Sequence, residues 1–219
     1  MSVALYSAAV TTLDRFLKRT AAPAWAFFVL ALLLRPVGVA RLFHSAAYFA
    51  DERMYLRLAD VVAGGRFIGE GVELPPGLIY AMAFGRLMGL DAMGLRFMFC
   101  FLGAGMVAVV FLIARRVLGG WRQGHRIAGL AALVLCGYPY LIYLCGTFYS
   151  QTIFQLTLAL VFYYLLRFIQ ENRLASIGWA GFWLGLSGLT VVPILSAAPL
   201  MALWVILNGQ GKLMRRLGA

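Results

Sequence analysis

Two adjacent acidic residues, Asp51 and Glu52, open the one long polar interval of an otherwise apolar chain. This interval, residues 50–76, contains five of the protein's eight carboxylates. It also holds three arginines, Arg53, Arg57 and Arg66. A partly buried carboxylate is a good proton acceptor, and guanidinium groups pair well with phosphate oxygens. These residue types indicate acid–base chemistry on a phosphate-linked substrate, although an ordinary solvated loop would have the same composition.

The composition is that of a membrane protein. The chain is 63% apolar and 12% charged, with a mean hydropathy of +0.88, whereas a soluble domain is about half apolar and about a quarter charged. Several apolar runs approach the roughly 20 residues that cross a bilayer as a helix. The sequence therefore predicts an all-α polytopic membrane protein. The net charge of +11 comes from short basic clusters beside apolar runs, which is typical of membrane topology and not of nucleic-acid binding.

The order of apolar and polar segments predicts about six transmembrane helices in a single membrane domain, residues 1–219. A basic amphipathic segment, residues 1–21, would lie on the cytoplasmic surface. An outer loop, residues 44–91, would hold two interfacial helices, the first of which begins at Asp51–Glu52 and runs to about Ala63. A helix bundle, residues 92–208, would follow. The predicted spans are 22–43, 92–118, 127–144, 150–168, 174–190 and 191–207.

The segment that begins at Pro75 and runs to about Leu90 decides the topology. As a span it would be short, at roughly 24 Å. It would also place the arginines of residues 115–126 outside, against the positive-inside rule. We therefore interpret it as a second interfacial helix. On this map the cytoplasmic side carries a net charge of +10 and the outer side +1, with both termini cytoplasmic.

Two further patterns have more than one interpretation. Arg35 precedes Pro36 near the outer end of the first span, where it would either extend to the headgroups or bind an anionic lipid headgroup. Four glycines of the fifth span recur at steps of three and four, which predicts a face for close helix packing: Gly178, Gly181, Gly185 and Gly188. The three cysteines lack metal-ligand spacing and are expected to be buried.

An ordered set of short motifs resembles the integral-membrane glycosyltransferases of the C superfamily. The set starts with Asp51-Glu52-x-x-Tyr55, Leu58-Ala59 and Pro75-Pro76-Gly77. It continues through Arg96, Ala114-Arg115-Arg116-Val117-Leu118-Gly119, Tyr138-Pro139 and Gly185-Leu186-Ser187-Gly188-Leu189-Thr190. The set covers about residues 25–207 and is most similar to the branch of protein O-mannosyltransferases and the lipid A aminoarabinose transferase.

The resemblance implies an inverting transfer of a sugar from a polyprenyl-phosphate donor at the periplasmic or lumenal membrane face. It implies that Asp51 is the base that activates an acceptor hydroxyl. Glu52 and Tyr55 match the neighbouring motif positions, and Pro75 and Pro76 match the start of the second interfacial helix. We add as candidate donor contacts the arginines Arg35, Arg53, Arg57 and Arg66. The predicted location is the bacterial inner membrane.

The chain also departs from the family pattern. Relatives often have Ser-Glu where this chain has Ser150-Gln151, and Leu-Thr-Arg-Pro where it has Leu189-Thr190-Val191-Val192-Pro193. The chain also has fewer spans than usual. A non-catalytic scaffold that binds a membrane lipid or a partner subunit is therefore the alternative function. The acceptor is not indicated, no metal site is predicted, and a divalent cation stays open as a cofactor.

The charge map predicts that positions 70 and 121 lie on opposite sides of the membrane. Cysteines introduced as Glu70→Cys and Trp121→Cys are expected to react from opposite sides with a membrane-impermeant maleimide, applied to sealed cells and inverted vesicles. Labelling of both positions from the same side would refute the map.

Overall fold

The computed structural model describes residues 24–44, 47–66 and 74–208, and within these ranges the chain forms helices and no strand. The predicted all-α polytopic class is confirmed. The predicted cytoplasmic segment 1–21 lies outside the described residues, as do position 70 and the basic C-terminal residues.

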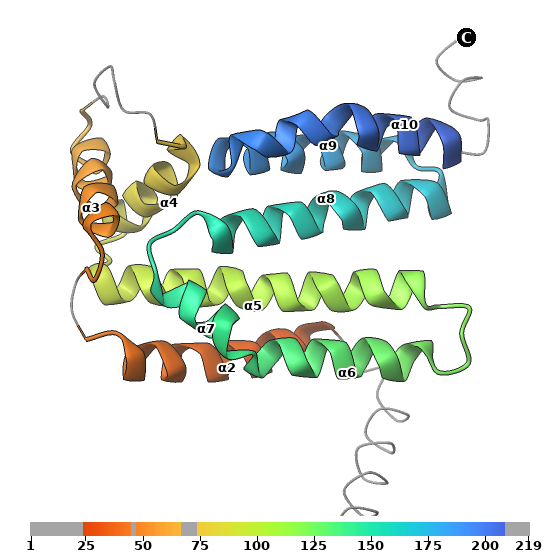
Figure 1. Cartoon of the computed structure of the whole chain (residues 1–219), viewed down its shortest axis with the longest axis horizontal. Helices are drawn as coiled ribbons and strands as arrows, with labels where there is room; N and C mark the ends of the chain where they lie inside the picture. Colours follow the sequence, from red (N-terminus) through yellow and green to blue (C-terminus); the bar gives the residue numbers. More distant parts are fainter. Residues whose placement is uncertain (1–23, 45–46, 67–73, 209–219) are drawn as a thin grey trace, which may run out of the picture.

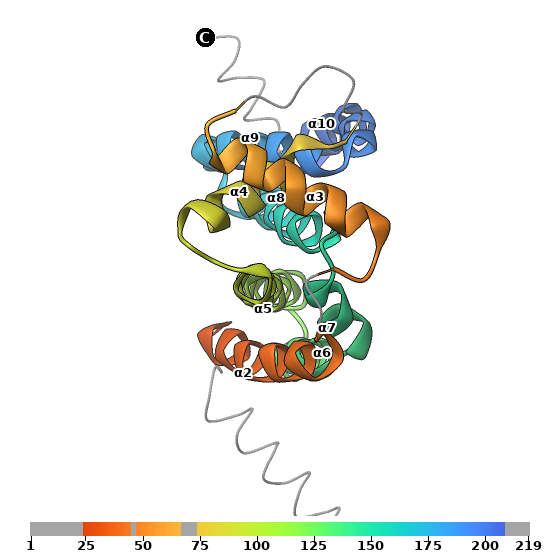
Figure 2. The same cartoon turned by 90° about the vertical axis from the view of Figure 1, so that its left-hand side faces the viewer.

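Most helices run side by side along one axis (Figure 1). The long helix α5 occupies the middle, with α2 and α6 packed on one side and α8 on the other. Helix α9 and the η1–α10 segment lie beyond α8 (Figures 1 and 2). The bounds are α2 Ala24–Leu42, α5 Ala92–Val117, α6 Gly124–Gly137, α7 Pro139–Gly146, α8 Gln151–Glu171, α9 Leu174–Thr190, η1 Val192–Ala197 and α10 Ala198–Asn208.

Three described helices, α2, α5 and α8, are long and apolar enough to cross a membrane. The bent pair α6 and α7 is a fourth candidate span if taken as one element. The last two predicted spans form where the sequence places them, but as shorter apolar helices, Leu174–Thr190 and Val192–Asn208. The described residues thus hold three or four helices of spanning length where six were predicted.

The loop between α2 and α5 forms the two expected helices, α3 (Ala50–Ala63) and α4 (Pro76–Leu87). Both lie at the end of the bundle where α2 ends and α5 begins, and α3 runs crosswise to the bundle axis (Figures 1 and 2). Gly65, at φ +73°, follows the end of α3, and a proline at its first position starts α4. At 12 residues, α4 is too short to span a bilayer.

Pro139 divides the third predicted span into α6 and α7, which meet at an angle of 48°. Because proline has no N–H, the carbonyl of Leu135, four residues earlier, loses its helical partner. Arg35 of α2 replaces that partner: its Nη2 donates to the Leu135 carbonyl at 3.2 Å. Its Nη1 donates to the Leu141 carbonyl at 3.1 Å and lies 3.1 Å from Cys145 Sγ. The arginine thus stabilises a break in a neighbouring helix.

This geometry corrects both interpretations of Arg35. The side chain is 1% exposed and points into the bundle toward α6 and α7, whereas both interpretations placed its guanidinium among headgroups. The physical reason is that a broken helix inside an apolar bundle offers unpaired carbonyl groups, which attract a buried donor.

The glycine face of α9 packs less closely than the spacing predicts. A Cβ on Gly188 would meet the Leu195 side chain at 2.7 Å, so this position does permit a close approach. At Gly178, Gly181 and Gly185, a Cβ would meet no described atom within 4 Å. Periodicity identifies which residues share a face, but it does not show that a neighbour covers that face.

Replacement of Arg35 by methionine is expected to lower the free energy of unfolding by about 1–3 kcal/mol, because the partly buried Leu135 carbonyl would lose its hydrogen-bond partner. Unfolding of the purified protein by denaturing detergent measures this change. The control is Arg41→Met, since Arg41 is exposed on the same helix and its replacement should change stability by less than about 0.5 kcal/mol. Equal effects of the two substitutions would contradict the assigned role.

Candidate active site

The Glu52 side chain is fully buried, at 0% exposure, and both of its carboxylate oxygens accept backbone hydrogen bonds. Oε2 accepts from the N–H of Tyr48 at 2.6 Å and from that of Phe49 at 3.3 Å. Oε1 accepts from the N–H of Phe148, 96 residues further along the chain, at 2.9 Å. The carboxylate therefore joins the turn before α3 to the connection between α7 and α8.

Arg96, near the start of α5, is the buried cation beside this carboxylate. It is 1% exposed, and its Nε donates to the Gly146 carbonyl at 2.7 Å. That carbonyl belongs to the last residue of α7, where helix carbonyls lack an intrahelical partner. Three aromatic rings surround the guanidinium carbon, with centroid distances of 4.7 Å to Phe148, 5.1 Å to Phe43 and 5.8 Å to Tyr48. The negative charge of Glu52 acts on this guanidinium.

We call Glu52 and Arg96, with the backbone groups that they bond, the Glu52–Arg96 clamp. A buried charge is tolerated when it is balanced and hydrogen-bonded. Glu52 accepts three backbone hydrogen bonds, and its charge interacts with that of Arg96. The sequence grouped Glu52 with Asp51 as catalytic. In the structure its oxygens are used inside the fold, so its geometry favours positioning of α3 over contact with a substrate.

Asp51, one residue earlier, lies in the first turn of α3. It is exposed, so the partial burial expected of a proton acceptor at this position is wrong. Burial raises the pKa of the Tyr55 phenol above its usual value, and the charges of Asp51 and Tyr149 raise it further. Burial also raises the pKa of Tyr149, followed by the charges of Asp51 and Glu52. Tyr55 lies one turn beyond Asp51 on the same face of α3, and the Tyr149 ring lies 6.1 Å from that of Phe49, two residues before Asp51. Both phenols stay protonated at neutral pH and can donate hydrogen bonds next to an exposed carboxylate.

The three candidate arginines of the outer loop are exposed but are not gathered around Asp51. Arg53 and Arg57 are two and six residues beyond Asp51, which on a helix puts them on the opposite side from the Asp51–Tyr55 face. Arg66 follows the end of α3 at Ala63, which lies roughly 18 Å along the helix from Asp51 at 1.5 Å per residue. The spacing of this helix therefore separates the cations from the acid.

Pro75 and Pro76 start α4 and are partly buried. The next residue, Gly77, lies against α9: a Cβ there would meet the Leu189 carbonyl oxygen and Thr190 Cγ2, both at 2.8 Å. The proline pair and the glycine thus set where α4 meets the end of α9. A contact of either proline with substrate stays a prediction.

Residues 73–218 match the family described as dolichyl-phosphate-mannose-protein mannosyltransferase, which is about two thirds of the chain. The chain belongs to this family. Comparisons with curated proteins and with solved structures give no match. The family match confirms a multi-pass membrane glycosyltransferase whose donor is, in general terms, a polyprenyl-phosphate sugar. The matched range includes Arg96 and the α7–α8 connection but begins after Asp51 and Glu52.

Two other features bear on the chemistry of this mannosyltransferase-family protein. Among the described residues, no three His, Cys, Asp or Glu side chains lie together as a metal site. An apolar groove of about 440 Å³ lies between α5, α8 and the η1–α10 segment. Its α8 residues lie 13 to 17 positions beyond Tyr149, or roughly 20–25 Å along the helix. The groove is therefore remote from Asp51.

Sequence reasoning missed several residues of the candidate site: Tyr48, Phe148 and Tyr149, and the role of Arg96. An arginine inside an otherwise apolar helix is a signal that can find Arg96, because such a residue needs partners in the bundle. No such signal exists for Phe148, which contributes its backbone N–H to Glu52.

Replacement of Glu52 by glutamine is expected to lower the free energy of unfolding by about 3 kcal/mol. The amide keeps one acceptor oxygen, leaves a backbone N–H without a partner and removes the charge that faces Arg96. Asp60→Asn is the matched control on the same helix. Asp60 is exposed and forms an ion pair with Arg86 at 2.9 Å, and the loss of an exposed ion pair lowers the free energy of unfolding by less than about 1 kcal/mol. Thermal and denaturant unfolding in detergent measure the stability of both variants. Equal losses of stability would contradict the role assigned to the Glu52–Arg96 clamp.

Proposed function

We propose that the protein transfers a sugar from a polyprenyl-phosphate donor to an acceptor hydroxyl, with Asp51 as the general base. The family supports the donor class, and the exposed position of Asp51 in the first turn of α3 carries the assignment of the base. The reaction would take place at the end of the bundle where α3 and α4 lie (Figure 1).

The proposed step is a single displacement at the anomeric carbon of the sugar. The acceptor oxygen forms a bond to that carbon while Asp51 takes the hydroxyl proton. The bond between the anomeric carbon and the phosphate oxygen breaks, and the polyprenyl phosphate leaves with the electron pair. One displacement from the face opposite the leaving group inverts the configuration of the sugar.

The surroundings of Asp51 support this role. Tyr55 and Tyr149 keep their protons, so they can donate to the acceptor or to the sugar without competing for the acceptor's proton. The buried Glu52 fixes the helix turn that carries Asp51, which suits a base that must meet a reacting atom within hydrogen-bond distance.

The donor phosphate needs positive charge near Asp51. Arg53, Arg57 and Arg66 are exposed in the same loop but lie away from the Asp51–Tyr55 face of α3, so the group that contacts the phosphate is an open part of the proposal. Arg35 is withdrawn as a donor contact, because its guanidinium is used by the α6 and α7 carbonyls. We assign the reaction to the periplasmic or lumenal face, with the termini on the cytoplasmic side, from the charge distribution of the sequence. A divalent cation and a partner subunit stay open parts of the proposal.

Replacement of Asp51 by asparagine is expected to lower kcat by about 10²–10⁴-fold, the usual contribution of a positioned general base. The assay measures sugar transfer from labelled polyprenyl-phosphate sugars, mannose first, in membranes that contain the protein and an acceptor mixture. Asp60→Asn removes the same charge from the same helix, and its rate should stay close to that of the unmodified protein.

The unfolding temperature of each variant is measured alongside, because a loss of fold would also abolish transfer. Asp51 is exposed, so Asp51→Asn should unfold like the unmodified protein. Unchanged transfer by Asp51→Asn would remove Asp51 as the base. An unmodified protein that transfers none of the sugars would instead favour the non-catalytic scaffold.

A further inference from the structure

A polar cleft lies at the opposite end of the bundle from α3 and α4, where α5 and α8 both end (Figure 1). Its volume is about 280 Å³, and it is lined by Leu112, Arg115 and Arg116 of α5 and by Tyr163 of α8. At about 30 Å³ per water molecule, this space holds a phosphate group with several waters.

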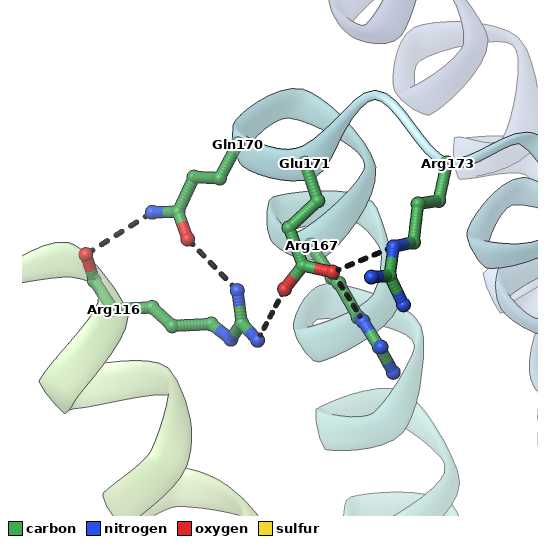
Figure 3. Close-up of polar contacts among 5 residues, drawn as sticks. All are labelled: Arg116, Arg167, Gln170, Glu171 and Arg173. Atoms are coloured by element: carbon green, nitrogen blue, oxygen red, sulfur yellow. Dashed lines mark hydrogen bonds and ion pairs between the residues drawn. The ribbon is translucent and has the colours of Figure 1, made fainter.

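Arg116 is fixed in this cleft by a network with the end of α8 (Figure 3). Its Nη1 donates to Gln170 Oε1 at 3.0 Å, and its Nη2 donates to Glu171 Oε1 at 2.9 Å. Gln170 Nε2 donates back to the Arg116 carbonyl at 3.1 Å, and the Tyr163 ring lies 5.0 Å from the guanidinium carbon. The guanidinium is therefore held in one orientation.

One carboxylate serves several cations here. Glu171 pairs with Arg116 and with Arg167, each at 2.9 Å, and with Arg173 at 3.5 Å (Figure 3). Arg115 adds a fourth positive charge, and its guanidinium carbon lies 5.6 Å from the Phe111 ring. Within the described part of the chain, no carboxylate pairs with Arg115. Four arginines against one acid leave an excess of positive charge at this end of the bundle.

We propose that this cleft binds the phosphate of an anionic phospholipid, with Arg115 and the Tyr163 hydroxyl as the contacting groups and Arg116 as a fixed neighbouring charge. Three observations favour this ligand. The charge of the cleft is complementary to a phosphate, guanidinium groups pair with phosphate oxygens, and the cleft lies at the ends of α5 and α8, two helices long and apolar enough to cross a membrane. The proposal is independent of the transferase reaction at the other end of the bundle.

The test measures lipid binding by the full-length protein in neutral detergent with native mass spectrometry. The probes are dioleoyl phosphatidylglycerol and dioleoyl phosphatidylcholine, which differ in net charge but share acyl chains. Preferential retention of the anionic lipid is expected, and Arg115→Gln should weaken it about tenfold. Tyr163→Phe should weaken it less, because the ring stays under Arg116 and only the hydroxyl is lost.

Arg122→Gln is the matched control, since Arg122 is exposed in the α5–α6 connection and does not line the cleft. Its retention of the anionic lipid should equal that of the unmodified protein. An equal loss in Arg122→Gln and Arg115→Gln would overturn the proposal in favour of general surface attraction. Equal binding of the two lipids would also overturn it.

A free phosphate is the other source of the same chemistry. Inorganic phosphate alone, at millimolar concentration, should not raise the unfolding temperature as phosphatidylglycerol does, and an equal rise would overturn the lipid assignment. Folding of the Arg115→Gln variant is checked by its unfolding temperature in neutral lipid. If Arg115→Gln does not fold, the Tyr163→Phe variant tests the proposal instead. Binding of phosphatidylglycerol by Tyr163→Phe equal to that of the unmodified protein would contradict the proposal.

Discussion

A carboxylate inside an apolar bundle is stable only if its oxygens are bonded and its charge is balanced. Glu52 meets both conditions with three backbone N–H groups and the nearby Arg96. One side of this arrangement is the turn that begins α3, and the other is the connection between α7 and α8. The position of Asp51 at the end of the bundle depends on this bonded carboxylate, because Asp51 is the adjacent residue of the same helical turn.

The short helix α7 is the irregular element that gives the buried charges their partners. Arg35 bonds carbonyls before and within α7, and Arg96 bonds the carbonyl of its last residue, Gly146. Both arginines replace helical hydrogen bonds that a continuous helix would have made for itself. The break between α6 and α7 and the two buried arginines are therefore one structural solution. That solution explains why two arginines can lie in helices that otherwise face lipid or apolar neighbours.

Much of the fold follows from the sequence, because the length of an apolar run and the residues that start or end a helix are local signals. The start of α3 at Asp51, its end before Gly65 and the start of α4 after Pro75 are all predicted within a residue or two. The direction of charged side chains is not a local signal. Arg35 was placed among headgroups, but it is buried, because the carbonyl groups that it bonds belong to a helix more than 90 residues away. The close packing predicted for the glycines of α9 fails for the same reason, since the sequence does not show which helix will lie beside them.

The long chain separation between Glu52 and Phe148 also sets an order of assembly. The bonds of Glu52 to Tyr48 and Phe49 are local and can form as soon as α3 forms. Its remaining oxygen has no partner until the ribosome has made residue 148 and the α6–α7 pair has packed against α5. The candidate site is therefore completed late in biosynthesis. Before that point the nascent chain carries an incompletely bonded carboxylate at the membrane surface, where water can still solvate it.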